Sequence, residues 1–152
     1  MKIILLLAQC LVLEMSSVCC QRGWSPQYGL LTLKDSSGHE LYVKREVSGT
    51  NHDLIIISTN KDYCAHPDSA KEYIFDNLSD AVYYKLNGDV LNLFRNGPLE
   101  LKKDFHSSIQ IDYNDLPIIE WMELKKDSSK LGLRRLEVPL DETLAQKCEG
   151  TR

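Results

Sequence analysis

The chain has 152 residues, of which 43% are apolar and 26% are charged, and its formal net charge is −4. This length is typical of a single domain, and the apolar fraction is sufficient for a core, so extended disorder, a collagen-like repeat and a multi-domain chain are excluded. The composition alone indicates no activity.

The first twenty residues have the pattern of a secretory signal peptide. Lys2 precedes an apolar run over residues 3–13, which is much shorter than the roughly 20 residues that span a bilayer. Glu14 ends this run. A buried N-terminal helix is the alternative. We expect an extracytoplasmic protein, secreted or periplasmic, that does not span a membrane.

Cleavage is expected after Cys19 or Cys20, because either site leaves small residues at the two positions that a signal peptidase reads. The mature protein would be one β-rich domain over residues 21–152. Loss of Lys2 and Glu14 lowers the basic residues from 18 to 17 and the acidic residues from 22 to 21, so the net charge stays at −4. A bacterial lipid anchor on either cysteine is an alternative, although the usual upstream Leu is missing.

If cleavage follows Cys20, the leader removes Cys10, Cys19 and Cys20, and two of the five cysteines remain. These two are Cys64 and Cys148. A pair of cysteines in an oxidising compartment predicts one disulfide. We therefore expect a Cys64–Cys148 bond that ties down the C-terminal segment.

Alternation of apolar and polar side chains is the dominant pattern, and it predicts half-buried antiparallel strands. An apolar run at 54–57 predicts a strand covered on both faces. The predicted strands fall at 29–34, 40–47, 54–57, 83–86, 90–94, 99–102, 109–113, 118–125 and 131–138. We expect a mainly β fold of about eight strands, an antiparallel β-sandwich or small barrel with one or two short helices. An α+β fold is the alternative.

The clearest turn signal is Asn87-Gly88, which predicts a type I′ hairpin. The stretch from Tyr84 to Leu91 reads Y-x-L-x-G-D-x-L and resembles a hairpin of small exported lipocalin-like β domains. It covers under a tenth of the chain, and Gly23-Trp24 lacks the residue between Gly and Trp in the usual lipocalin start. The resemblance transfers no site residues.

Two segments favour helices. Residues 67–78 combine a Pro-Asp-Ser start with helical spacing, but Tyr73-Ile74-Phe75 within them also suits a strand. At the C-terminus, Asp141 is a predicted N-cap, and Leu144 and Cys148 share one helix face.

The sequence lacks the common catalytic motifs, including G-x-S-x-G, H-E-x-x-H, the P-loop, G-x-G-x-x-G and C-x-x-C. We therefore expect no catalytic, metal or cofactor site. The segment with Asp62, Cys64, His66 and Asp68 offers metal ligands or a Cys–His nucleophile, and both need a free thiolate. We interpret it as a loop that carries half of the disulfide.

Two surface features remain. Asn77 begins an N-glycosylation sequon, which is modified only in a eukaryotic host. A basic patch with a local charge of +4 is either a solvated hairpin or a site for an anionic surface, a glycan or an acidic protein. Its members are Lys125, Lys126, Lys130, Arg134 and Arg135. Nucleic acid is not expected, because the chain is acidic and the patch lacks interleaved aromatics.

We expect an exported, non-enzymatic binding module that recognises a protein partner or a small ligand. The alternatives are a secreted hydrolase with a dispersed acid/His site and a structural envelope or extracellular protein. A closed apolar cavity lined by the aromatic residues would favour a small ligand. An exposed edge strand would favour a protein, and a polar cleft with a histidine and two carboxylates would favour an enzyme.

Overall fold

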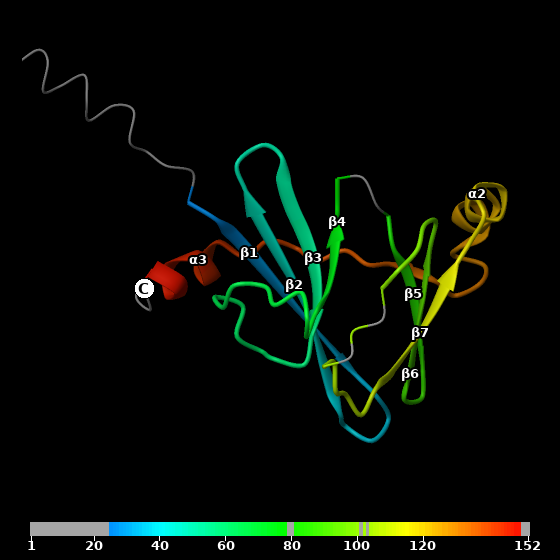
Figure 1. Cartoon of the computed structure of the whole chain (residues 1–152), viewed down its shortest axis with the longest axis horizontal. Helices are drawn as coiled ribbons and strands as arrows, with labels where there is room; N and C mark the ends of the chain where they lie inside the picture. Colours follow the sequence, from blue (N-terminus) through cyan, green and yellow to red (C-terminus); the bar gives the residue numbers. More distant parts are fainter. Residues whose placement is uncertain (1–24, 79–80, 101, 103, 150–152) are drawn as a thin grey trace, which may run out of the picture.

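A computed structural model of the chain describes residues 25–149, except 79–80, 101 and 103. The predicted leader lies outside the described residues. In the described part, eight strands and two helices are arranged in two four-stranded sheets that lie beside each other (Figure 1). The mainly β prediction is confirmed, and the arrangement is sandwich-like, not a closed barrel.

The first sheet, sheet A, is an antiparallel meander in the order β1-β2-β3-β4. The first three strands confirm the predictions from alternation and from the apolar run. The carboxylate of Asp35 closes the β1–β2 turn by accepting the backbone N–H groups of Ser37 and His39, both at 2.8 Å. The bounds are β1 (Gln27–Lys34), β2 (Glu40–Ser48), β3 (His52–Ser58) and β4 (Tyr73–Asp76).

The second sheet, sheet B, has the order β7-β6-β5-β8. Its strands are β5 (Tyr83–Asn87), β6 (Val90–Arg95), β7 (Gln110–Asp115) and β8 (Arg134–Arg135). β7 runs parallel to β6, so the expectation of antiparallel pairing throughout is wrong for this pair. The connection between them returns the chain to the same end of the sheet before β7 begins.

The predicted β5–β6 hairpin is confirmed, but its turn class is wrong. Asn87 pairs with Val90, so the loop residues are Gly88 and Asp89. Gly88 has a φ of 60°, and no described residue other than glycine has a positive φ. A positive φ at only the first loop position is the type II′ pattern, for which glycine is required.

The strand predicted at 118–125 is wrong, because these residues form helix α2 (Ile118–Asp127). Trp121 and Leu124 are three residues apart and therefore share one helix face, which lies against the outer side of sheet B. The Trp121 and Tyr83 rings pack edge to face with centroids 5.4 Å apart. Pro117 at the N-terminus and lysines in the last turn are the helix signals that the alternation concealed.

Three other assignments are corrected. The predicted strand at 131–138 contains only the two residues of β8, and the described residues of 99–102 form no strand. The helical interpretation of 67–78 is wrong, and its strand alternative is correct at β4. The C-terminal helix α3 (Glu142–Glu149) is confirmed, and the Asp141 carboxylate accepts the Thr143 N–H at 2.9 Å as its cap.

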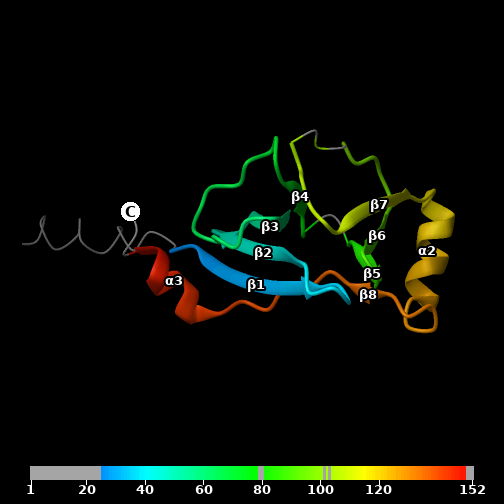
Figure 2. The same ribbon diagram turned by 90° about the horizontal axis from the view of Figure 1, so that it is seen from below.

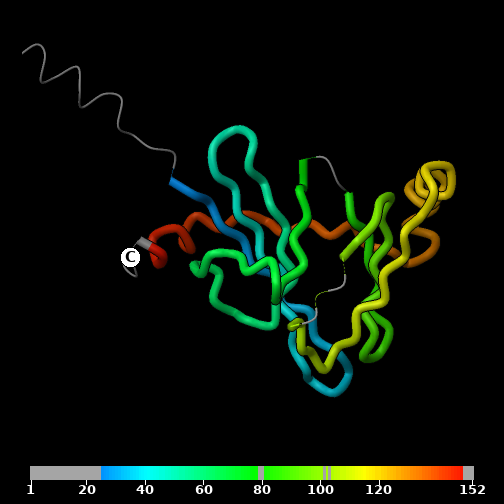
Figure 3. Tube along the Cα trace, in the orientation of Figure 1, coloured from blue at the N-terminus to red at the C-terminus, as the bar shows by residue number. Residues whose placement is uncertain are grey.

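The main core lies between the facing sides of the two sheets and includes Val43, Ile57 and Phe75 from sheet A and Leu91 and Leu93 from sheet B. The opposite side of sheet A is also covered. There Tyr28 and Leu30 pack with α3 and with the loop at 59–72, whose Tyr63 and Cys64 join this second cluster. Figure 3 shows this loop curving toward α3. No helix in the described part of the chain is long and apolar enough to cross a membrane.

Candidate functional site: a cavity between the two sheets

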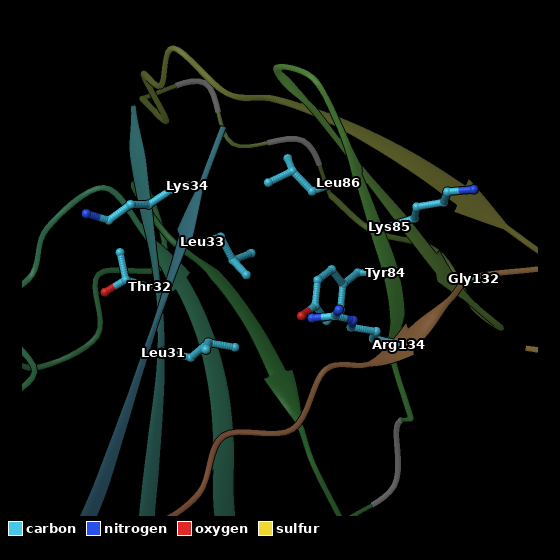
Figure 4. Close-up of a pocket in the computed structure, with 9 residues that line it drawn as sticks. All are labelled: Leu31, Thr32, Leu33, Lys34, Tyr84, Lys85, Leu86, Gly132 and Arg134. Atoms are coloured by element: carbon cyan, nitrogen blue, oxygen red, sulfur yellow. The ribbon is translucent and has the colours of Figure 1, made fainter. Parts of the chain in front are cut away.

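A cavity with a volume of about 450 Å³ and an opening to solvent lies between β1 on one side and β5 and β8 on the other. Figure 4 shows four side chains that point into this space, Leu31 and Leu33 from β1 and Tyr84 and Leu86 from β5. Arg134 reaches the same space from β8. We call this space the inter-sheet cavity.

Strand geometry explains which side chains enter the inter-sheet cavity. Alternate residues of a strand point to opposite faces, so Leu31 and Leu33 face inward while Thr32 and Lys34 face away (Figure 4). Tyr84 lies opposite Arg134 in the β5–β8 register, which places the guanidinium beside the phenol ring. Two separate sheets therefore supply the apolar walls and the cation.

The segment between β8 and α3 packs against β1 and joins the main core. Leu136 and Val138 are buried in the main core, and the Leu136 N–H bonds to the Val82 carbonyl at 2.7 Å. A Cβ on Gly29 would overlap the Pro139 carbonyl oxygen and lie 2.9 Å from Val138 Cγ1. β1 therefore requires a glycine here so that this segment can pass against it.

Three basic side chains, Lys34, Lys85 and Arg134, line the cavity, and of these Arg134 is the one that turns toward it in Figure 4. In the described part of the chain it forms no ion pair, whereas neighbouring Arg135 pairs with Glu137 at 3.0 Å. Lys34, on the rim, is held by Glu40 at 2.6 Å. Leucine side chains and a tyrosine ring beside a guanidinium match an amphipathic molecule that carries a carboxylate or another anionic group.

The five residues of the predicted basic patch lie on different elements of the fold. Lys130 pairs with Asp127 at 2.6 Å, Arg135 pairs with Glu137, and Arg134 faces the inter-sheet cavity. Lys125 and Lys126 lie in the last turn of α2. The five residues thus belong to a helix, a loop and a two-residue strand, and the expected basic hairpin is wrong.

The Asp62–Asp68 segment forms the expected loop. Cys64 and Cys148 are bonded with an S–S distance of 2.04 Å, so Cys64 has no free thiolate. No group of three His, Cys, Asp or Glu among the described residues could hold a metal ion.

The contact between His39 and Asp35 belongs to the β1–β2 turn. His39 Nδ1 lies 2.7 Å from Asp35 Oδ2. Burial opposes ionisation of Asp35, but hydrogen bonds from His39 outweigh it and lower the pKa of this carboxyl. The inter-sheet cavity and the smaller hollows beside Phe105 and beneath α2 have no histidine, aspartate or glutamate in their walls.

Asn77 is half-buried, and its side-chain nitrogen, where a glycan would attach, donates to Asp53 Oδ2 at 2.9 Å. Asp53 also forms a two-pronged pair with Arg45, with N···O distances of 2.8 and 2.7 Å. The sequon therefore overlaps a structural network, and its glycosylation stays a prediction.

Sequence reasoning did not single out the four apolar side chains of the inter-sheet cavity. Alternation places Leu31, Leu33 and Leu86 on inner faces. It does not show which inward side chains border a cavity and which are fully packed. Comparison of the chain with protein-family models, with curated proteins and with solved structures gave no match.

Proposed function

We propose that this protein is an extracytoplasmic binding module that takes a small amphipathic anion into the inter-sheet cavity. The observation that carries the proposal is the convergence of Leu31, Leu33, Tyr84 and Leu86 beside Arg134, a cation without a described acidic partner. The Cys64–Cys148 bond supports a site of action outside the cytoplasm, because disulfides persist in oxidising compartments.

The volume and the chemistry of the cavity limit the ligand. A space of about 450 Å³ lies at the lower end of the range for small-molecule sites, roughly 300–1,000 Å³. Its leucines can bury a hydrocarbon chain or a ring, and each buried CH₂ contributes about 0.8 kcal/mol. Arg134 at the open side leaves the anionic group partly hydrated. A medium-chain carboxylate has this combination of size, apolar body and charge.

The test is a fluorescence titration with dansyl-labelled undecanoic acid and with its uncharged methyl ester. We expect the acid to bind the native protein more tightly than the ester. Arg134→Gln should weaken acid binding at least about tenfold, because hydrogen bonds to charged groups contribute roughly 1.5–3 kcal/mol. The same substitution should leave ester binding nearly unchanged.

Arg135→Gln is the matched control, because Arg135 is adjacent in sequence but pairs with Glu137. Leu31→Trp should fill the cavity and remove binding of both probes, with circular dichroism confirming that the variant is folded. Equal losses from Arg134→Gln and Arg135→Gln, or unchanged binding in Leu31→Trp, would refute the proposed site.

A further inference from the structure

Helix α2 lies at the end of the molecule opposite α3 (Figures 1 and 2). One side of it is anchored on sheet B by Trp121, which is only 8% exposed. The other side exposes three large apolar side chains, Ile118 at 56%, Ile119 at 70% and Met122 at 55%. An apolar group of this kind on the surface indicates a binding face, because single exposed apolar residues are common but contiguous ones are not.

Two lysines extend this apolar group. A helix turns by about 100° per residue, so Ile118, Ile119 and Met122 occupy a sector of roughly 100°. Lys126 falls inside the same sector one turn later, and Lys125 borders it. We call these five residues the α2 tip. Glu120 lies on the far side of the helix, and Glu123 lies on one flank.

The lysines of the α2 tip have no ion-pair partner in the portion of the chain that the structure describes. Of the three acidic residues of α2, Asp127 pairs with Lys130, and Glu120 and Glu123 lie outside the sector of the α2 tip. Leu131, in the loop after α2, is 52% exposed and adds further apolar surface to this end. The partner of such a surface must combine an apolar interior with negative charge.

We propose that the α2 tip docks on a lipid surface that carries anionic headgroups. The three apolar side chains enter the interfacial region of the bilayer, and Lys125 and Lys126 face the headgroups. Interfacial helices combine an apolar face with lysines in this way.

A protein partner fits the α2 tip less well. A stable protein interface buries about 800 Å² on each side and involves some 20–30 residues, far more than this tip provides. Such interfaces are centred on Trp, Tyr or Arg, and the only tryptophan of α2 is turned inward against Tyr83.

Vesicle flotation tests this proposal. The protein is the secreted form, with its mass showing that the predicted leader is absent, and the vesicles are phosphatidylcholine with or without 30% phosphatidylserine. We expect binding to the anionic vesicles that weakens as salt is raised, and little binding to phosphatidylcholine alone. A lysine beside an anionic surface contributes about fivefold, so Lys125→Gln/Lys126→Gln should lower the partition coefficient about 25-fold.

Ile118→Ser/Ile119→Ser/Met122→Ser should abolish flotation while leaving the far-ultraviolet spectrum unchanged. The matched controls are Lys61→Gln/Lys71→Gln and Leu78→Ser, which alter exposed residues elsewhere. Arg134→Gln should also float normally, because docking does not depend on the inter-sheet cavity.

Three results would overturn the proposal: no flotation with anionic vesicles, flotation that the α2 substitutions leave intact, or equal losses in the control variants. Self-association or capture of an acidic protein that the triple serine variant removes, without vesicle binding, would assign the α2 tip to a protein partner instead.

Discussion

The two faces of β1 differ in what packs against them. On one face, Tyr28 and Leu30 are packed beneath α3 and beneath the loop that carries Cys64. On the other face, Leu31 and Leu33 border a cavity that opens to solvent. The same alternation of side chains therefore produces a closed side of sheet A and, a few ångströms away, an open chamber.

The two faces also differ in the links between the chain segments that pack on them. The closed side is held by links between distant parts of the chain, including a disulfide that joins residues 84 positions apart and a Lys44–Glu72 ion pair with both side chains almost fully buried. The inter-sheet cavity has no such link across its mouth in the described structure. We infer that the links on the closed side hold α3 and the loop at 59–72 in place, and that the inter-sheet cavity, at the edge of the main core, is available for binding.

The largest expected effect is on the closed side. Cys64→Ser/Cys148→Ser removes a link across a separation of 84 residues, which the chain-entropy model values at about 4–5 kcal/mol. Urea unfolding of the native and double-serine proteins measures the difference in free energy of unfolding. A change below about 1 kcal/mol would show that α3 holds this side without the bond.

The buried ion pair should have the next largest effect. Lys44 Nζ lies 2.7 Å from Glu72 Oε1 and 3.2 Å from the Asp62 carbonyl oxygen. Lys44→Met leaves a buried carboxylate without its cation and should cost about 3–5 kcal/mol. Lys44→Met/Glu72→Gln should recover part of this loss, because it removes the isolated charge. Lys34→Gln, which removes the cation of an exposed ion pair, is the control. A comparable loss of stability in this variant would show that burial of the Lys44–Glu72 pair has no special effect.

Acid should weaken sheet A on both faces, because Glu72 lies on the closed side and Asp53 shares the face of Ile55 and Ile57 in the main core. Burial opposes ionisation of Glu72, but hydrogen bonds from Lys44 and Ser58 outweigh it and hold its pKa below the ordinary 4.5. The Arg45 guanidinium, with help from Asn77, lowers the pKa of Asp53 below 3.8. Both groups have depressed folded-state pKa values, so their contribution is present above about pH 5 and is lost as the pH falls through the folded values.

Urea midpoints measured from pH 7 to pH 3 would show this loss. The stability deficit of Lys44→Met should shrink on acidification, because a protonated Glu72 no longer needs a cation. A deficit that stays constant with pH would mean that Lys44 acts through packing alone.

A smaller loss of stability is expected from a substitution at Gly29 of β1. In Gly29→Ala the new Cβ would press on the Pro139 carbonyl oxygen and on Val138, which pack against β1 on the side of the main core. Overpacking of this kind costs about 1–3 kcal/mol. Thermal unfolding measures it, with Thr32→Ala on the outward face of β1 as the reference. If Gly29→Ala is as stable as Thr32→Ala, the close contact is not required.

Local patterns in the sequence predict the first three strands of sheet A, the β5–β6 hairpin, the cap of α3 and the Cys64–Cys148 pairing. Each of these depends on neighbouring residues or on the redox compartment. The failures depend on tertiary contacts: Trp121 selects helix for α2 by packing on Tyr83, and β7 is parallel because of the path of its connection. The inter-sheet cavity was not predictable, since it is a gap between elements and not a property of any one of them.

The central claim is that the open face of β1 binds a small anion while the closed face does not. A ¹³C methyl NMR titration with decanoate tests it directly. We predict shift changes at Leu31, Leu33 and Leu86 that saturate together, with Leu30 and Leu144 unchanged. Changes confined to Leu30 and Leu144, or no saturable change at the cavity leucines, would contradict the claim.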